Sequence, residues 1–200
     1  MGENRFKSTA QLLQEKRAPA RDSFQNEAMA LGTRLEPEAR RRYIAKTGQK
    51  VRPVCVQSTR YDWLRASLDG LANDHGTVVE IKCGASVYRR VSKSRSVPSY
   101  YYGQVQHILA ITGLASLDFW CYWPDHPQVL VPVERDDAYI ERLLNRELEF
   151  WNRVQTRGVS HPERGNHPRP RATPVPRRTS PPAKLPSEGG FRKFVRSLLN

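Results

Sequence analysis

The sequence predicts an α/β (α+β) fold in which a central mixed sheet is flanked by helices. Short segments rich in Val and other β-formers alternate along the first 156 residues with longer segments whose apolar residues recur at helical spacing. Strands and helices interleaved in this order are typical of a sheet covered by helices. A chain of 200 residues, 38% of them hydrophobic, is long enough for one such domain plus appendages.

The first expected helix spans residues 35–48, with Pro37 at its first helical position and Gly48 as its stop. The elements expected after it are, in chain order, strands at 52–58, 63–71 and 77–83, a helix at 99–113, strands at 117–123 and 128–133, and a closing helix at 136–154. Polar turns separate the first three strands, the second of them being "NDHG" at 73–76. We interpret the segment 87–99, "VYRRVSKSRSVPS", as a loop.

Composition restricts the partners and the chemistry. The formal net charge of +13 favours a polyanion, either nucleic acid or an anionic membrane surface. No apolar run approaches the length of a membrane span and no signal peptide is seen, so we expect a cytoplasmic protein. The three cysteines, Cys55, Cys83 and Cys121, are scattered, which excludes a zinc ribbon, a disulfide framework and a four-cysteine iron–sulfur cluster. We expect all three to be small core residues.

The chain divides near Arg157. From there to Asn200 it holds ten Lys/Arg against two acids, together with eight of the fifteen prolines. We therefore predict a domain at 1–156, a disordered Pro/Arg-rich linker at 157–188 and a basic amphipathic helix at 189–200. This last helix is too short to be stable alone, so it would dock either on its own domain or on a partner.

The strand "GTVVEIKC" carries an acid and a lysine where apolar residues are expected. Side chains two apart in a strand point to the same face, so Glu80 and Lys82 stand side by side. If the preceding strand pairs with this one through "NDHG", Asp69 converges on Glu80. Two converging carboxylates repel each other unless a cation lies between them, and oxygen ligands of this kind suit Mg²⁺ or Mn²⁺. The alternative is a surface ion pair beside a turn aspartate.

Four motifs in order resemble a known family. "ALGTRLEPEAR", "SLDG", "VEIK" and "YYGQVQH" resemble the YqaJ-type viral recombinases, which belong with lambda exonuclease to the PD-(D/E)XK nuclease superfamily. The resemblance covers roughly residues 2–154 and implies a restriction-endonuclease-like core. It implies a Mg²⁺-dependent deoxyribonuclease of phage or prophage origin, active in the bacterial cytoplasm.

The resemblance also implies the site residues, which are Glu36, Asp69, Glu80, Lys82 and Gln104. Asp69 would be the central metal ligand and Glu80 the second, with the Ile81 carbonyl as a further ligand and Glu36 facing the metal directly or through water. Lys82 would be the catalytic lysine, and Gln104 would orient the attacking water or the scissile phosphate.

Two neighbouring residues have smaller expected parts. For His107, which shares a helix face with Gln104, we expect packing or hydrogen bonding rather than metal ligation. Arg40, one turn after Glu36, would hold that carboxylate in place.

Relatives that degrade DNA 5′→3′ hold the 5′-phosphate with an arginine and a serine that precede the first motif. Residues 2–16 resemble the segment just after that serine, and Ser8 does not match it. We expect a misplaced start, a truncation or another element that supplies the pocket. The family implies resection of duplex ends for a single-strand annealing protein, and a homo-oligomer such as a trimeric ring. The alternatives are an endonuclease with the same core and a non-catalytic DNA-binding relative.

The segment that follows the expected strand at 77–83 is the predicted DNA contact. No acidic residue occurs between Glu80 and Asp118. The basic residues expected to contact DNA phosphates are Arg89, Arg90, Lys93 and Arg95. Phosphate contacts of this type fix position on DNA without reading sequence.

Overall fold

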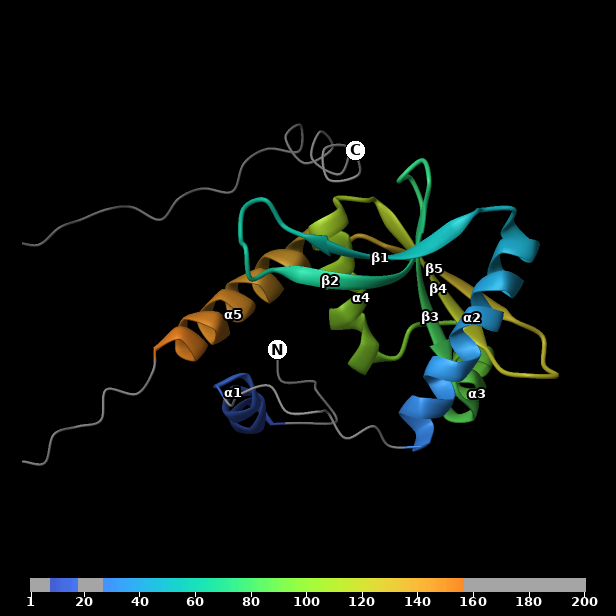
Figure 1. The fold of residues 1–200 in the computed structure, drawn as a ribbon, viewed down its shortest axis with the longest axis horizontal. Helices are drawn as coiled ribbons and strands as arrows, with labels where there is room; N and C mark the ends of the chain where they lie inside the picture. The colour runs from blue at the N-terminus through green and yellow to red at the C-terminus, as the bar shows by residue number, and fades with distance from the viewer. Residues whose placement is uncertain (1–7, 18–26, 157–200) are drawn as a thin grey trace, which may run out of the picture.

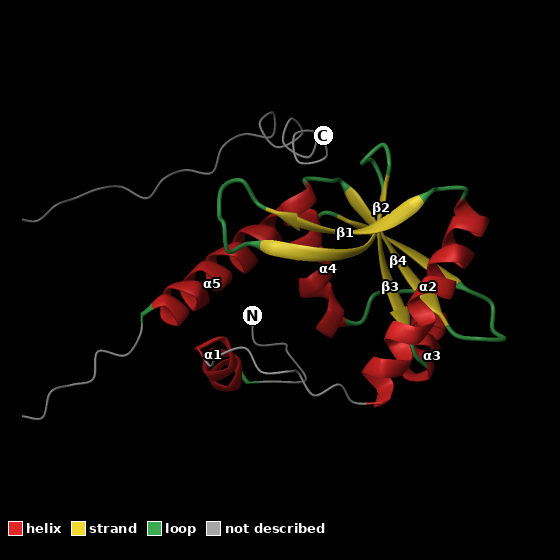
Figure 2. Cartoon of the chain, viewed as in Figure 1, coloured by secondary structure: helices red, strands yellow, loops and turns green. Residues whose placement is uncertain are grey.

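The computed structural model describes residues 8–17 and 27–156, which form a five-stranded sheet with helices on both of its faces (Figures 1 and 2). The elements in chain order are α1 (Thr9–Arg17), α2 (Glu27–Thr47), β1 (Val51–Gln57), β2 (Arg65–Ala72), β3 (Val78–Cys83), α3 (Ala85–Ser94), α4 (Ser99–Thr112), β4 (Ser116–Tyr122), β5 (Val129–Glu134) and α5 (Asp137–Gln155). The predicted mixed α/β architecture is confirmed. The linker and terminal helix predicted for 157–188 and 189–200 lie outside the described residues.

The strands follow one another in the sheet in the order β1-β2-β3-β4-β5. All neighbours are antiparallel except β3 and β4, which are parallel. Parallel neighbours need a long crossover, and here α3 and α4 provide it. The carboxyl end of β3 therefore leads directly into these two helices.

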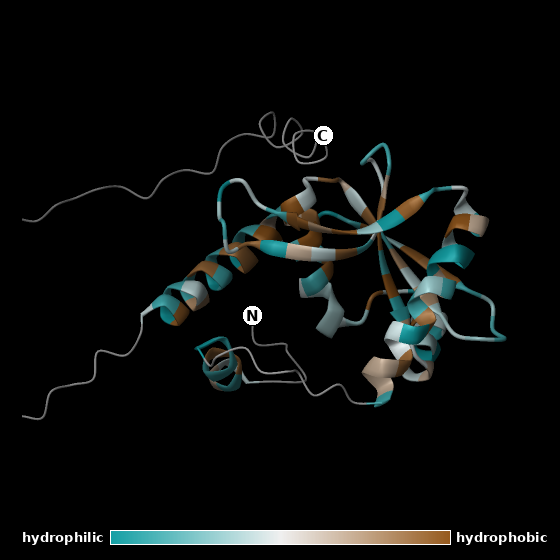
Figure 3. Cartoon of the chain, viewed as in Figure 1, coloured by the Kyte–Doolittle hydropathy of each residue, from teal (hydrophilic) through white to brown (hydrophobic). Residues whose placement is uncertain are grey.

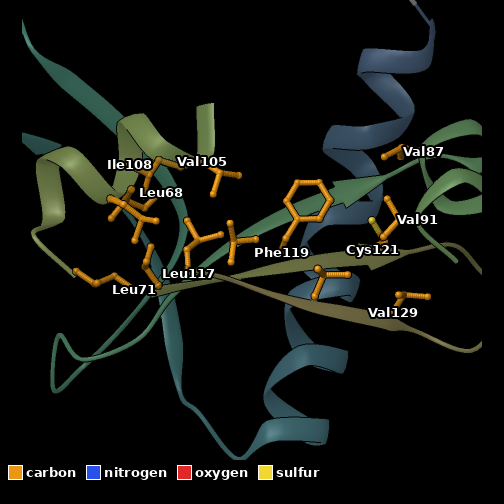
Figure 4. Close-up of a cluster of buried hydrophobic side chains, with 14 of the residues drawn as sticks. Leu68, Leu71, Val87, Val91, Val105, Ile108, Leu117, Phe119, Cys121 and Val129 are labelled. Atoms are coloured by element: carbon orange, nitrogen blue, oxygen red, sulfur yellow. The ribbon is translucent and has the colours of Figure 1, made fainter. Parts of the chain in front are cut away.

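Each face of the sheet has its own apolar core. Figure 4 shows the larger one, in which side chains such as Leu68 and Phe119 of the sheet meet Val91 of α3 and Val105 of α4. The smaller core lies under α2, where Tyr43 meets Trp120 edge to face. Hydrophobic residues accordingly recur along the strands in Figure 3. Since β4 is buried on both faces, it reads as a nearly continuous apolar run.

Two hydrogen bonds attach α2 to β4. The Tyr43 hydroxyl donates to Asp118 Oδ2 at 2.6 Å, and the Trp120 indole N–H donates to the Ala39 carbonyl at 3.1 Å. Both polar groups would otherwise be buried without a partner. The side of α2 that carries Glu36 and Arg40 is thereby held against β2 and β3.

The helix ends test the sequence signals. Gly48 and Gly113 follow α2 and α4 with φ of 75° and 69°, as their prediction as stops requires. Pro37 is not at a first turn but inside α2, because the strong helix formers Ala28 to Leu31 start the helix earlier. None of the helices within 8–17 and 27–156 is both long enough and apolar enough to cross a membrane.

Two further expectations were wrong. The segment 87–99 is no simple loop, because Val87, Tyr88 and Val91 form a buried stripe on α3, which ends at Arg95 with φ of 51°. Cys55 is exposed rather than in the core, because β1 is an edge strand and this residue lies on its open face. Cys121 is buried and Cys83 is half-buried.

Candidate active site

The strands β2 and β3 part next to Asp69. Their antiparallel pairing runs through Leu71 with Val78 and Gly70 with Val79, and the next position sets Asp69 opposite Glu80. There the Asp69 carboxylate, not a backbone carbonyl of β2, accepts the hydrogen bond from the Ile81 N–H at 2.8 Å. The hairpin thus brings together the two acids that the sequence predicted to converge.

Gly70 permits the close strand packing beside this opening. A Cβ at Gly70 would lie 2.6 Å from Val79 Cγ1 and 2.8 Å from Val51 Cγ2, closer than atoms can pack. The three strands therefore approach one another only because residue 70 has no side chain. Asp69, the neighbour of Gly70, is consequently carried by a tightly packed part of the hairpin, which restricts where its carboxylate can lie.

Glu80, Lys82 and Gln104 form a closed triangle of hydrogen bonds. Glu80 Oε1 accepts from Lys82 Nζ and from Gln104 Nε2, both at 2.6 Å, and Lys82 Nζ also donates to Gln104 Oε1 at 3.2 Å. Alternation along β3 puts the first two side chains on one face, and α4 covers that face with Gln104. Glu80 is 1% exposed, so this pair is no surface ion pair.

Glu36 approaches from the other side of the sheet, on α2. It is paired with Arg40 one turn later, and Arg40 Nε donates to the Asp69 backbone carbonyl at 2.7 Å. Arg40 therefore does more than the sequence indicated, because it links the acid of α2 to the backbone of the acid of β2. The charge of Glu36 acts on both Asp69 and Glu80.

Burial and neighbouring charges shift the pKa values of the residues at the site. Burial, supported by the charges of Asp69 and Glu36 and opposed by Lys82, raises the pKa of Glu80 to about 7. Burial also raises the pKa of Asp69, against the Ile81 N–H and Lys82. For Lys82 burial lowers the pKa, but Glu80 and Asp69 outweigh it and the net shift is upward. Burial raises the pKa of Cys83 to about 12, so this neighbouring thiol is neutral.

The donor set fits a hard divalent cation. Glu80 Oε2 is buried without a hydrogen-bond partner, which costs about 1–3 kcal/mol unless a cation satisfies it. In a strand the C=O of a residue points to the same side as its N–H, so the Ile81 carbonyl faces Asp69 as well. In the described part of the chain no three His, Cys, Asp or Glu side chains gather as a metal cluster. The groups available to a cation are therefore the carboxylates of Asp69 and Glu80 and the Ile81 carbonyl, with water for the remaining positions. The Glu36 carboxylate is paired with Arg40.

Residues of α4 that the sequence did not assign to the site also contribute. The Lys82 ammonium lies 4.6 Å from the ring centroid of Tyr101. His107 bonds to groups other than the site acids Asp69 and Glu80: its Nδ1 lies 2.8 Å from Glu147 Oε1 and its Nε2 lies 3.0 Å from the Arg65 carbonyl. The expected hydrogen-bonding role of His107 is the one the structure shows.

The four predicted DNA-contacting residues are all exposed at the end of the crossover next to the site. Arg89, Arg90 and Lys93 lie on α3, and Arg95 immediately follows it. Because α3 packs its apolar stripe inward, the basic residues are held outward on a rigid helix rather than on a loop. The sequence does carry a signal for this helix, because Val87 and Val91 are four residues apart, which is helical spacing and not the alternation of a strand.

Comparison with known proteins gives this geometry a family context. A family model described as the YqaJ-like viral recombinase domain matches residues 1–115. An uncharacterised protein, YqaJ, from Bacillus subtilis strain 168 is 27% identical over an alignment of 158 residues that covers 76% of this chain. The chain spans about half the length of this curated relative, 49%.

Solved structures of exonucleases are similar to this chain. An alkaline exonuclease from Laribacter hongkongensis, LHK-Exo, is 31% identical with a TM-score of 0.61, the match covering 74% of this chain and 75% of that one. Its complex with dAMP matches with a TM-score of 0.67 and 29% identity over 77% and 84% of the two chains. A phage-related exonuclease from Haemophilus somnus 129PT, 11% identical over 73% and 78% of the chains with a TM-score of 0.56, shares the fold.

Proposed function

The chain belongs to the YqaJ-like viral recombinase family, and we propose from this premise that it is a metal-dependent deoxyribonuclease that degrades duplex DNA from its ends. One observation supports the proposal most directly. Asp69, Glu80, Lys82 and Gln104 come from three elements and meet where β2 and β3 part, in a fold similar to that of alkaline exonucleases. A buried acid with one oxygen that lacks a partner destabilises the fold, and in a non-catalytic relative no bound cation would offset that cost.

Asp69, Glu80 and the Ile81 carbonyl would hold Mg²⁺ or Mn²⁺, with Glu36 acting through water because Arg40 engages it. When bound, the ion would neutralise the crowded acids and stabilise negative charge on the phosphoryl oxygens. Magnesium commonly uses one or two carboxylates and keeps several waters, in agreement with the two-acid donor set.

Lys82 and Gln104 would position the reactants. The Lys82 ammonium, held by Glu80, would place positive charge beside the scissile phosphate, and the Gln104 amide would orient the attacking water. The water oxygen bonds to phosphorus and gives up one proton to the solvent. The bond from phosphorus to the 3′-oxygen breaks, and that oxygen takes up a proton from the solvent. The products are a 5′-phosphate and a 3′-hydroxyl.

We further propose 5′→3′ action on duplex ends, which leaves 3′ overhangs for a single-strand annealing protein in phage-type recombination. Arg89, Arg90, Lys93 and Arg95 would contact the DNA backbone, each neutralised phosphate adding about 0.9 to the slope of log affinity against log salt. A homo-oligomer, for example a ring of three, would keep such an enzyme on its substrate. These features come from the family resemblance and from exposed positive charge beside the site.

The experiment uses the full chain with end-labelled linear duplex DNA, with Mg²⁺ or with EDTA. We expect Mg²⁺-dependent loss of the DNA, and at least a thousandfold slower loss for Lys82→Ala and Asp69→Ala. Lys46→Ala and Glu141→Gln, exposed residues on α2 and α5, are matched controls and should degrade DNA like the parent.

Closed circular DNA under the same conditions distinguishes the exonuclease hypothesis from the endonuclease hypothesis. Rapid nicking of circles by the parent protein would favour the endonuclease with the same core. Parent-like cleavage by Lys82→Ala and Asp69→Ala would refute the site, and a parent protein that cuts neither form would refute the nuclease proposal.

A further inference from the structure

Two neighbouring tyrosine rings with a cation at each end lead from the candidate active site to the exposed face of α3. Lys82 Nζ lies 4.6 Å from the Tyr101 ring centroid, and the Tyr101 and Tyr100 centroids lie 4.6 Å apart with their planes at 55°. At the outer end the guanidinium carbon of Arg90 lies 5.7 Å from the Tyr100 centroid. We call Lys82, Tyr101, Tyr100 and Arg90 the cation–tyrosine row.

The row is anchored at several points. Tyr101 packs against the buried Phe119 of β4 at 6.0 Å between centroids. Arg90 projects from α3, which is fixed by its buried stripe and by the Tyr88 hydroxyl donating to the Pro127 carbonyl at 2.7 Å. Arg90 is therefore presented at a restricted position relative to Lys82 by packed secondary structure.

The two cations of the row differ in how their charge is used. Lys82 is 18% exposed and paired with Glu80. Arg90 is exposed and forms no ion pair with the residues that the structure describes. A cation–π contact at an exposed site contributes only about 0.5–1 kcal/mol, so Tyr100 can orient the guanidinium while leaving its N–H groups available for an anion.

The rings themselves are poor platforms for a nucleobase. Tyr100 already has the Arg90 guanidinium and the Tyr101 ring as neighbours, and Tyr101 has Lys82 in addition. The two rings lie between the two positive charges and act as a spacer. Arginine is well matched to phosphate, because its planar fork donates two parallel hydrogen bonds.

We propose that Arg90, supported by Tyr100, binds a phosphate that flanks the scissile phosphate on the cleaved strand. This inference rests on the proposed nuclease function and specifies a subsite of the same active site. Lys82 and Arg90 then hold neighbouring points of one DNA backbone, and the register of the strand relative to Asp69 and Glu80 is set partly by Arg90.

The test exchanges single phosphates for uncharged methylphosphonates at the three positions on either side of the first cleaved bond. Single-turnover cleavage by the full chain gives a rate at saturation and a half-saturating protein concentration for each duplex. With the parent protein, one flanking position should raise the half-saturating concentration about tenfold. With Arg90→Ala that position should have no further effect, because the contact is already lost.

Arg142→Ala is the matched control, because Arg142 lies 5.9 Å from the Tyr139 ring centroid in the same kind of cation–π contact on α5. It should retain the parent's response to the methylphosphonate, as should Tyr100→Phe, which keeps the ring. Tyr100→Leu should lose part of the response. Melting transitions within about 2 °C of the parent would show that the variants are folded.

The outcomes separate the two proposals. If the parent cleaves DNA but Arg90→Ala responds to every methylphosphonate as the parent does, the subsite is wrong and the nuclease function stands. If Tyr100→Leu also keeps the full response, the supporting role of Tyr100 is wrong. A parent protein that cleaves no DNA overturns the proposed function and this inference with it.

Discussion

Replacing Glu80 by glutamine should change how the stability of the metal-free protein depends on pH. Glu80 is 1% exposed, and burial raises its pKa from 4.5 to about 7. Glutamine has the same shape and still accepts hydrogen bonds from Lys82 and Gln104, but it cannot ionise. The Glu80→Gln variant therefore isolates the free energy of ionising this carboxyl group inside the protein.

The sign follows from linkage between protonation and folding. Because the pKa is higher in the folded state, Glu80 favours folding most below pH 4.5, and that contribution is lost as pH rises through about 7. Integrating between pH 5 and pH 8, the parent should lose about 2–3 kcal/mol of unfolding free energy relative to the variant. This is opposite to the usual salt-bridged carboxylate, whose contribution is lost in acid.

Urea denaturation of both proteins in EDTA at pH 5 and pH 8 measures the difference. A change of about 2–3 kcal/mol corresponds to a relative shift in midpoint of roughly 1–2 M urea. Glu141→Gln, at an exposed position of α5, is the control, and its unfolding free energy relative to the parent should be the same at pH 5 and pH 8. A difference between parent and Glu80→Gln that is constant with pH, or that grows in favour of the parent at pH 8, would refute the reasoning.

Two more predictions concern contacts around the site. Burial lowers the pKa of His107, but its bonds to Glu147 and the Arg65 carbonyl outweigh this and raise it, so its contribution is complete below pH 6.5 and is lost as pH rises through the raised value. His107→Gln should therefore cost about 1–3 kcal/mol at pH 6 and less in alkali, as urea denaturation can measure; an equal cost at both pH values would contradict the charged pair. Arg40→Lys should raise the Mg²⁺ concentration for half-maximal cleavage about tenfold, since lysine lacks the planar guanidinium whose separate nitrogens donate to Glu36 and to the Asp69 carbonyl. The exposed neighbour Arg41→Lys is its control, and equal Mg²⁺ requirements for both would show that Arg40 does not position the acids.

Much of the fold was predictable because local patterns and tertiary burial agree in most elements. Three predicted elements are confirmed in the structure: the β-branched segment forms β3, a turn follows β2, and a glycine ends α4. The errors arose where a local signal was weak or competed with another. Pro37 suggested a helix start that the preceding helix formers override, and the buried stripe of α3 is only three residues among serines and arginines.

The site was predictable in its members and less so in its contacts. Alternation within β3 was enough to put Glu80 and Lys82 on one face, and the hairpin was enough to bring Asp69 near them. The bond from Arg40 to the backbone of Asp69 joins residues 29 apart in the chain. The contact of Tyr101 with Lys82 likewise depends on how α4 lies on the sheet, and no local pattern encodes it.

The sequence alone determined which acidic residues a hairpin could bring together, because charge within an apolar strand and a turn of fixed length are local properties. Only the tertiary structure decided that Glu80 keeps one oxygen without a partner, that Arg40 restrains Glu36, and that two tyrosines connect Lys82 to Arg90. These features arise where separate elements pack together. Their distances depend on the burial of the whole core, which no short segment specifies.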